Sequence, residues 1–157
     1  VGRVLQGGRG IAKFADSLTL GSYGKPFRPL RTPVDWLSRD PAMVDAYRAD
    51  PDCGFTCTWD WYRDMNVGTR FINDPDTVAR IPKKLPVYVF AGSEDPVGAA
   101  SGGVDRLIAA YEAAGVRDVQ SRVYPGGRHE SLNEVNRDEV TQDLIKWLDA
   151  RMVSQAS

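Results

Sequence analysis

The sequence contains only one histidine, His129, and two cysteines, Cys53 and Cys57, among its 157 residues. Two cysteines can form at most one disulfide bond, which is too few to stabilise a domain of this size. One histidine and two cysteines are also too few ligands for a zinc site. We therefore interpret both cysteines as reduced, partly buried thiols of a cytoplasmic protein. The sequence implies no metal and no organic cofactor.

The chain also lacks a strong excess of either charge. It has 20 Lys and Arg against 21 Asp and Glu, so no bulk positive field attracts nucleic acid or an anionic membrane. No apolar run approaches the ~20 residues of a membrane helix, and the N-terminus has no apolar signal-peptide core. With 42% hydrophobic and 26% charged residues, the composition is that of a globular domain.

Residues 1–80 show no alternation of apolar and polar residues that is typical of a strand, and they hold three of the four tryptophans. Short helices are predicted there. Asp40 and Asp74 each precede a proline, which is the pattern of a helix N-cap followed by proline at the first helical position. A longer helix is predicted from about Thr58 to Phe71.

From residue 81 the pattern changes to strand, helix, strand, helix. Residues 86–91 form a continuous apolar run typical of a strand covered on both faces, and Val119–Tyr124 is a second strand. Apolar residues at helical spacing lie between them and stop at Gly115, and a last helix follows Asn136. The buried face of this last helix is predicted to contain Val140, Leu144, Trp147, Leu148 and Met152. Two successive βα units predict a parallel pair of strands and an α/β fold.

Two parallel strands do not make a stable sheet by themselves. The first eighty residues offer no further strand, and the chain begins with Val1 rather than Met. We therefore expect these residues to be the C-terminal part of something larger, completed by another segment or another copy.

The loops that follow the two predicted strands carry candidate catalytic side chains. Asp95 follows the first strand, and His129 follows the second. Because the carboxyl ends of parallel strands share one edge of a sheet, these loops are expected to lie side by side. An Asp that accepts from one imidazole nitrogen leaves the other nitrogen to act as a general base. The alternative is that Asp95 caps a turn and His129 is an ordinary surface or structural residue.

A serine hydrolase also needs a nucleophile on a G-x-S-x-G turn, and the sequence contains no such motif. The nearest approximation is Ser101 in residues 99–103. It lies after the acid rather than before it, and it is predicted to cap the helix that starts near Val104. No candidate oxyanion hole precedes it.

Several stretches resemble a known family. Residues 85–97 (LPVYVFAGSEDPV), 124–130 (YPGGRHE) and 133–137 (NEVNR) resemble the C-terminal half of α/β-hydrolases. The resemblance is to the serine aminopeptidase S33-like group, which includes bacterial lysophospholipases and monoacylglycerol-lipase-like enzymes. Residues 23–27, 31–40 and 50–55 resemble the cap segment of that group.

The resemblance, which covers about residues 20–152, implies the C-terminal portion of an α/β-hydrolase fold. Residues 1–80 would be a helical cap or lid, and residues 81–157 the last two βα units of a mostly parallel sheet. It implies a catalytic triad in which Asp95 is the acid and His129 the base. The nucleophile serine and the oxyanion hole would lie in an N-terminal half, present as a separate chain or a swapped copy. This chain alone is then expected to be inactive.

The implied reaction is hydrolysis of a small lipophilic carboxylic ester, such as a monoacylglycerol or a lysophospholipid. Candidates for an acyl groove are Trp36, Tyr47, Trp59, Trp61, Tyr62, Met65 and Phe71; the alternative for each is that it packs the cap onto the hydrolase core. Candidates to meet an anionic head group are Arg28, Arg31 and Arg39, and the alternative for each is a solvated surface position. One alternative is a catalytically inactive truncated hydrolase or an assembly module that exchanges sheet elements. Another is an amidase or peptidase of the same fold. A nucleotide-binding domain is disfavoured, because no glycine-rich phosphate loop follows the first strand.

Overall fold

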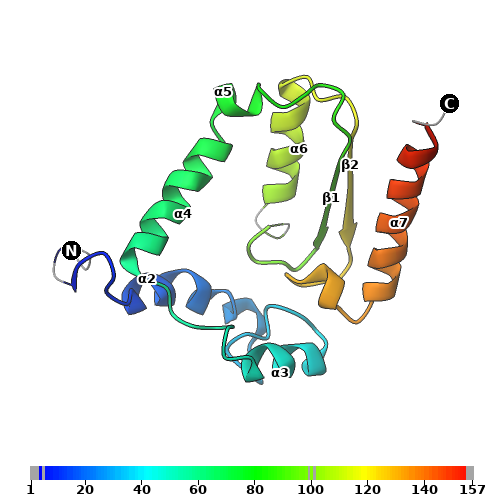
Figure 1. Ribbon diagram of the computed structural model, residues 1–157. Coiled ribbons are helices and arrows are strands. Elements are labelled where there is room, and N and C mark those ends of the chain that lie inside the picture. The colour runs from blue at the N-terminus through cyan, green and yellow to red at the C-terminus, as the bar shows by residue number, and fades with distance from the viewer. Residues whose placement is uncertain (1–3, 5, 99, 101, 155–157) are drawn as a thin grey trace.

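A computed structural model describes residues 4, 6–98, 100 and 102–154 of the chain (Figure 1). The first part consists of α2 (Lys13–Leu18), the 3₁₀ turns η1 (Leu20–Ser22) and η2 (Lys25–Phe27), α3 (Pro41–Ala49), α4 (Trp59–Ile72) and α5 (Pro75–Val78). The second part consists of β1 (Val87–Gly92), α6 (Gly103–Ala113), β2 (Val119–Tyr124), the 3₁₀ turn η4 (Ser131–Asn133) and α7 (Arg137–Ser154).

The helix starts predicted in the first part are confirmed. The Asp40 carboxylate accepts a hydrogen bond from the backbone N–H of Ala42 at 2.9 Å, and Asp74 caps α5 in the same way. The Thr58 hydroxyl accepts from the backbone N–H of Trp61 at 3.2 Å, so α4 begins where the sequence predicts. Each of these side chains satisfies a backbone N–H that has no partner inside its helix.

The two strands pair in parallel, in a register that runs from Val87 opposite Val119 to Gly92 opposite Tyr124. This confirms both predicted strands and their direction. Figure 1 shows α6 on one side of the strand pair and α7 on the other. Both arrows point toward the blue and cyan part of the chain that contains α2 and α3. Helices α2 and α3 therefore lie at the carboxyl edge of the sheet, whereas α4 leads away from this edge to α5, which lies beside the C-terminal end of α6.

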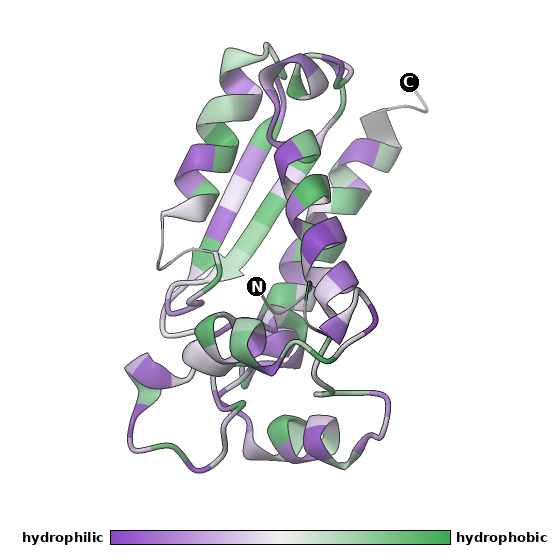
Figure 2. Ribbon diagram, turned by 90° about the vertical axis from the view of Figure 1, so that its left-hand side faces the viewer, coloured by the Kyte–Doolittle hydropathy of each residue, from purple (hydrophilic) through white to green (hydrophobic). Residues whose placement is uncertain are grey.

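Strand β1 is much more apolar than β2, as Figure 2 shows. The sequence predicts that β1 is covered on both faces, but only Ala91 and Gly92 are buried and residues 87–90 are half-buried. The prediction is therefore wrong for most of the strand. The reason is that, within the described residues, β1 has β2 as its one neighbouring strand.

Helix α7 is covered only in part. Val140 is 1% exposed, and Leu144 and Trp147 are half-buried, but Leu148 is 44% and Met152 71% exposed. The predicted buried face is thus confirmed near the start of the helix and wrong for Leu148 and Met152, which the described chain leaves uncovered. Neither α7 nor any other helix in the described ranges is long and apolar enough to cross a membrane.

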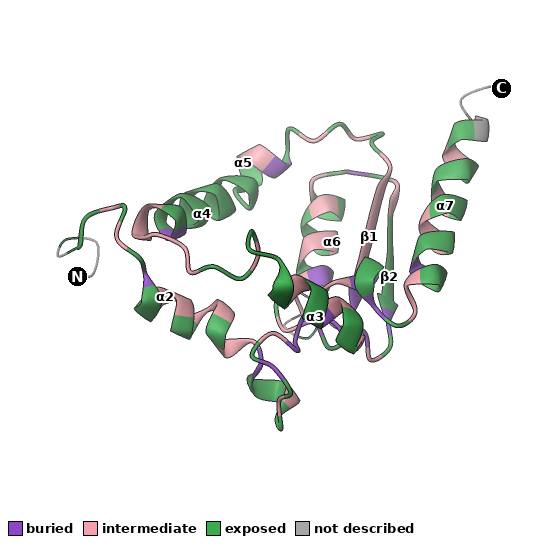
Figure 3. Ribbon diagram, turned by 60° about the horizontal axis from the view of Figure 1, so that its bottom comes forward, coloured by how far each residue is buried: buried purple, intermediate pink, exposed green. Residues whose placement is uncertain are grey.

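The core is small and lies where the carboxyl ends of the strands meet the segment before α3 (Figure 3). The chain exposes 10372 Å² of accessible surface. A compact folded chain of 17.3 kDa exposes about 7,800 Å² on the usual scaling of surface with mass. The excess of about 2,600 Å² is close to one partner's share of the largest obligate protein interfaces.

Candidate active site

The loops after β1 and β2 are joined to each other by their backbones. The N–H of Ser93 donates to the carbonyl of Tyr124, and the N–H of Glu94 donates to the carbonyl of Gly127, each at 2.9 Å. A Cβ atom on Gly92 would clash with the backbone of Gly127. This close approach requires glycine at position 92, and it fixes the two loops side by side.

The structure brings the predicted acid and base into contact. Asp95 Oδ1 and His129 Nδ1 are 3.0 Å apart, and the backbone N–H of Val97 donates to the same oxygen at 2.9 Å. The Asp95 side chain is 8% exposed, whereas the His129 ring is 36% exposed. Because Nδ1–H donates to the carboxylate, Nε2 is the ring nitrogen left to accept a proton. The catalytic role of the pair stays a prediction.

The electrostatics of the pair suit proton transfer. The hydrogen bond to Asp95 raises the pKa of His129 above its ordinary value, although burial acts in the opposite direction. Burial alone would raise the pKa of Asp95, but hydrogen bonds from His129 and from the backbone of Val97 outweigh it and lower that pKa. At neutral pH Asp95 is therefore ionised, and it stabilises an imidazolium on His129.

Trp36 packs against the histidine. Its ring centroid is 5.0 Å from that of His129, and the Tyr23 ring lies 5.0 Å from Trp36. The two backbones are also bonded: the N–H of His129 donates to the carbonyl of Trp36 at 3.3 Å, and the N–H of Glu130 to that of Leu37 at 2.8 Å. The segment before α3 is thus part of the surroundings of the pair.

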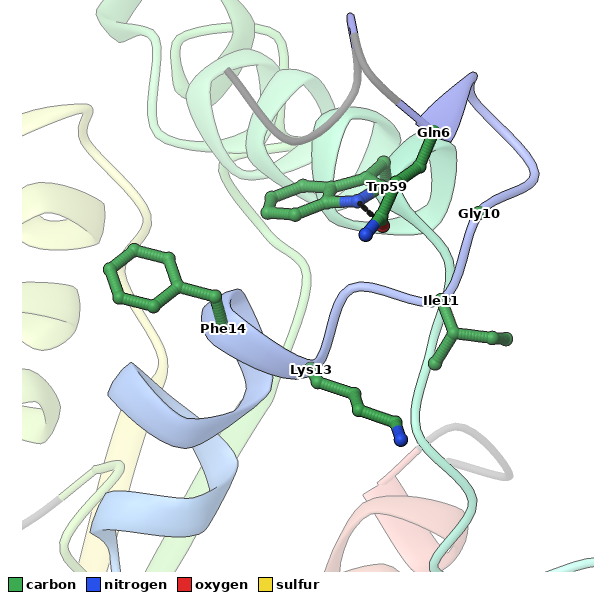
Figure 4. A pocket seen from close by; sticks show the side chains of 6 residues that line it. All are labelled: Gln6, Gly10, Ile11, Lys13, Phe14 and Trp59. Carbon is green, nitrogen blue, oxygen red and sulfur yellow. Dashed lines mark hydrogen bonds between the residues drawn. The ribbon is translucent and has the colours of Figure 1, made fainter.

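Of the other six side chains considered for an acyl groove, Tyr62 is buried, and Tyr47 and Trp59 are half-buried. The remaining three, Trp61, Met65 and Phe71, are exposed. Trp59 lines a cavity of about 600 Å³ together with Ile11 and Phe14 (Figure 4). Neither Asp95 nor His129 lines this cavity. The acyl groove stays a prediction; its member Trp36 packs against His129.

Arg39 pairs with a buried carboxylate. Its Nε donates to Glu134 Oε2 at 2.8 Å, and Glu134 is 1% exposed. The head-group role of Arg39 stays a prediction. Sequence reasoning missed Glu134, because nothing local distinguishes a buried glutamate from the solvated glutamates that are far more common.

Three further predictions concern serine, cysteine and metal. Ser101, the nearest approximation to a nucleophile motif, lies outside the described residues. Cys53 and Cys57 are both free thiols, as predicted. In the part of the chain that the structure describes, no three or more His, Cys, Asp or Glu side chains come together as metal ligands would.

Comparison with known proteins places the chain in a family. The family model of the serine aminopeptidases, S33, matches residues 7–136. A monoacylglycerol lipase of Mycolicibacterium smegmatis is 29% identical over 120 residues, which are 73% of this chain and 39% of that protein. A thermostable carboxyl esterase from Bacillus coagulans, solved in complex with glycerol, superposes with a TM-score of 0.82 and 28% identity over 94% of this chain and 49% of that chain.

A monoglyceride lipase from Saccharomyces cerevisiae, at a TM-score of 0.64 and 21% identity, shares the fold over 88% of this chain and 50% of its own. The chain thus spans between two fifths and one half of the length of these relatives. The two parallel strands with their helices correspond to part of an α/β-hydrolase fold, which confirms the predicted fold class. Since the family model matches well over half of its residues, this chain belongs to the serine aminopeptidase S33 family of α/β-hydrolases.

Proposed function

We propose that this chain supplies the acid and the histidine of a serine hydrolase that cleaves a small lipophilic carboxylic ester, of the monoacylglycerol or lysophospholipid kind. The observation that carries the proposal is the 3.0 Å contact between Asp95 and His129 at the ends of two adjacent parallel strands. The names of the relatives, monoacylglycerol lipase and carboxyl esterase, support an ester as the substrate.

In the proposed mechanism, a serine Oγ attacks the ester carbonyl while His129 Nε2 takes the hydroxyl proton. The tetrahedral intermediate collapses to an acyl-enzyme, and His129 returns the proton to the departing alcohol. Water then attacks the acyl-enzyme and gives a proton to His129, which passes it to the serine Oγ as the fatty acid leaves. Asp95 remains ionised throughout and holds His129 with Nε2 toward the serine.

The serine and the oxyanion hole, in this proposal, come from a polypeptide segment outside these 157 residues, either an N-terminal half or a swapped copy. Three observations support it. Strand β1 is half-buried with one neighbouring strand in the described residues, Leu148 and Met152 are exposed on α7, and the chain exposes about 2,600 Å² more than a compact chain of its mass. By itself the chain is then inactive.

Residues 1–80 act in this proposal as the helical cap, and residues 81–157 as the end of the hydrolase core. The packing of Trp36 against His129 supports a cap that reaches the reacting groups. We place the protein in the cytoplasm, where the free thiols of Cys53 and Cys57 are stable in the reduced form.

A fluorophosphonate probe, which labels activated serines, tests the proposal when followed by intact-mass spectrometry of the purified protein. We expect an adduct on a polypeptide segment other than these 157 residues, and we expect it to be lost in the His129→Ala variant. An adduct on Ser101 would contradict the external nucleophile. No adduct on any segment would favour an inactive remnant or an assembly module.

A second candidate is hydrolysis of an amide or peptide bond, favoured by the description of the matching family as serine aminopeptidases. The same Asp95–His129 pair would serve it, because the proton transfers are the same. Matched substrates that differ only in an ester or amide bond to one chromogenic leaving group separate the two. We expect faster turnover of the ester, and faster turnover of the amide would favour the second candidate.

A further inference from the structure

Glu134 is the most unusual charged group in the described chain, because it is 1% exposed and carries no catalytic assignment. Both of its oxygens are fully engaged. Oε1 accepts from the backbone N–H groups of Arg39 at 3.0 Å and Arg128 at 2.9 Å. Oε2 accepts from Arg39 Nε at 2.8 Å and from the backbone N–H of Val135 at 3.0 Å. A buried carboxylate is retained at low cost only when it is satisfied in this way.

The four donors belong to two segments that are far apart in the sequence. Arg39 lies just before α3, whereas Arg128 is the residue next to His129. Two further bonds cross the same boundary: Ser38 Oγ donates to the carbonyl of Asn133 at 2.8 Å, and Arg128 Nη1 donates to the carbonyl of Asp35 at 2.6 Å. Glu134 lies at the centre of these contacts and joins the residue 35–39 segment to the loop that carries the histidine.

We propose that Glu134 is a positioning residue for His129: its buried carboxylate holds the histidine loop against residues 35–39, so that the imidazole stands between Asp95 and Trp36. The loop follows β2 without regular secondary structure until η4, so the strand by itself does not fix the ring. A displacement of about 1 Å at a reacting group costs on the order of 100-fold in rate. As far as catalysis is concerned, this inference depends on the function proposed above.

The role requires a carboxylate rather than a neutral side chain. A glutamine at position 134 would keep one oxygen as an acceptor for two N–H groups, but its NH₂ group would face the other two donors. Burial raises the pKa of Glu134, and the hydrogen bonds from Arg128, Arg39 and Val135 more than offset this, so the carboxyl is ionised at neutral pH. Glu134→Gln is therefore a sharp perturbation of nearly unchanged volume.

The first test needs no enzymatic activity and uses the 157-residue chain. Since His129 is its only histidine, ¹⁵N NMR of the ring reports the tautomer without ambiguity. We expect the Nδ1–H form, bonded to Asp95, to predominate in the wild type, and the Nε2–H form to increase in Glu134→Gln. Asp138→Asn, which removes an exposed carboxylate on the first turn of α7, serves as the matched control and is expected to leave the tautomer unchanged. An unchanged tautomer in a folded Glu134→Gln chain overturns the inference.

Arg39→Met keeps the test decisive if Glu134→Gln does not fold. It removes the Nε donor and leaves the three backbone donors of the carboxylate, so we expect a smaller shift toward the Nε2–H form. A folded Arg39→Met chain with the wild-type tautomer counts against the inference.

The second test uses the hydrolase completed by its nucleophile segment, with the p-nitrophenyl ester of a short fatty acid as substrate. We expect kcat of Glu134→Gln to fall by on the order of 100-fold while KM changes by less than about twofold. Wild-type turnover with kcat retained in Glu134→Gln would refute the inference and leave the proposed function intact. A completed wild type without turnover, together with an altered tautomer in Glu134→Gln, would refute the proposed function and leave the positioning role intact.

Discussion

Replacing Asp95 by asparagine isolates the charge of the acid from its shape. Asp95 Oδ1 accepts two hydrogen bonds, from His129 Nδ1 at 3.0 Å and from the N–H of Val97 at 2.9 Å. A hydrogen bond to an ionised group contributes about 1.5–3 kcal/mol, and a bond between neutral groups about 0.5–1.5 kcal/mol. Asparagine keeps the oxygen and loses the charge, so each bond weakens by about 1 kcal/mol. We expect the free energy of unfolding to fall by up to about 2 kcal/mol, with the half-exposed His129 bond giving the smaller share.

The pH dependence of this loss follows from both partners. The pKa of Asp95 is lowered in the folded chain, so its stabilisation is present above the unfolded pKa of about 3.9 and is lost as the pH falls through the folded value. The pKa of His129 is raised, so its stabilisation is complete below the unfolded pKa of about 6.5 and is lost as the pH rises through the folded value. The difference between wild type and Asp95→Asn is therefore largest between these two limits.

Urea unfolding followed by tryptophan fluorescence at a series of pH values measures this difference. Glu94→Gln is the matched control, because it removes the same charge from the adjacent, exposed position and is expected to leave stability nearly unchanged. In parallel, NMR titration should show a lower pKa of His129 in Asp95→Asn than in the wild type, because the hydrogen bond and the charge that raise it are weakened while burial still lowers it. A stability difference that does not shrink as the pH falls below about 3.9 and on through the lowered pKa of folded Asp95 would refute the reasoning.

Three further predictions follow from individual residues. In the completed hydrolase, His129→Ala should abolish ester turnover, measured with a chromogenic ester; near-normal turnover would remove His129 from the mechanism. Gly92→Ala places a methyl group against the backbone of Gly127 and should destabilise the chain by about 3 kcal/mol in urea unfolding, whereas a neutral effect would show that the loops move apart freely. Val44 is 2% exposed in α3, and Val44→Ala should cost about 2 kcal/mol in the same assay; a loss below about 0.5 kcal/mol would mean that the segment before and within α3 does not unfold with the core.

The elements of the fold were predictable because their signals are local. Strand β2 has the bounds predicted from a run of six residues, and α4 begins within one residue of its predicted start, where Thr58 caps it through an N–H group three residues on. The meeting of Asp95 and His129 was also predictable, although they are 34 residues apart. It needs only the rule that parallel strands deliver their following loops to one edge.

What the sequence did not indicate depends on distant parts of the chain. Periodicity identifies the apolar side of α7 but not whether anything covers it, so Val140 is buried while Met152, on the same side, is exposed. The burial of Glu134 likewise depends on Arg39, 95 residues away. Until the segment that surrounds it is known, a carboxylate is predicted to be a solvent-exposed surface group.

One cause accounts for features that otherwise need separate explanations. Strand β1 has one neighbouring strand within the described residues, so it keeps in water apolar surface that a larger sheet would bury, and the exposed end of α7 adds to this surface. The proposed chemistry has a parallel deficiency: Asp95 and His129 need a nucleophile to act on, and the sequence contains no G-x-S-x-G turn. In the function proposed above, a strand beside β1 and the serine both come from the segment outside these 157 residues. A segment that covers the apolar surface would therefore also deliver the nucleophile to Nε2, and the stability of the chain and its activity should be gained together.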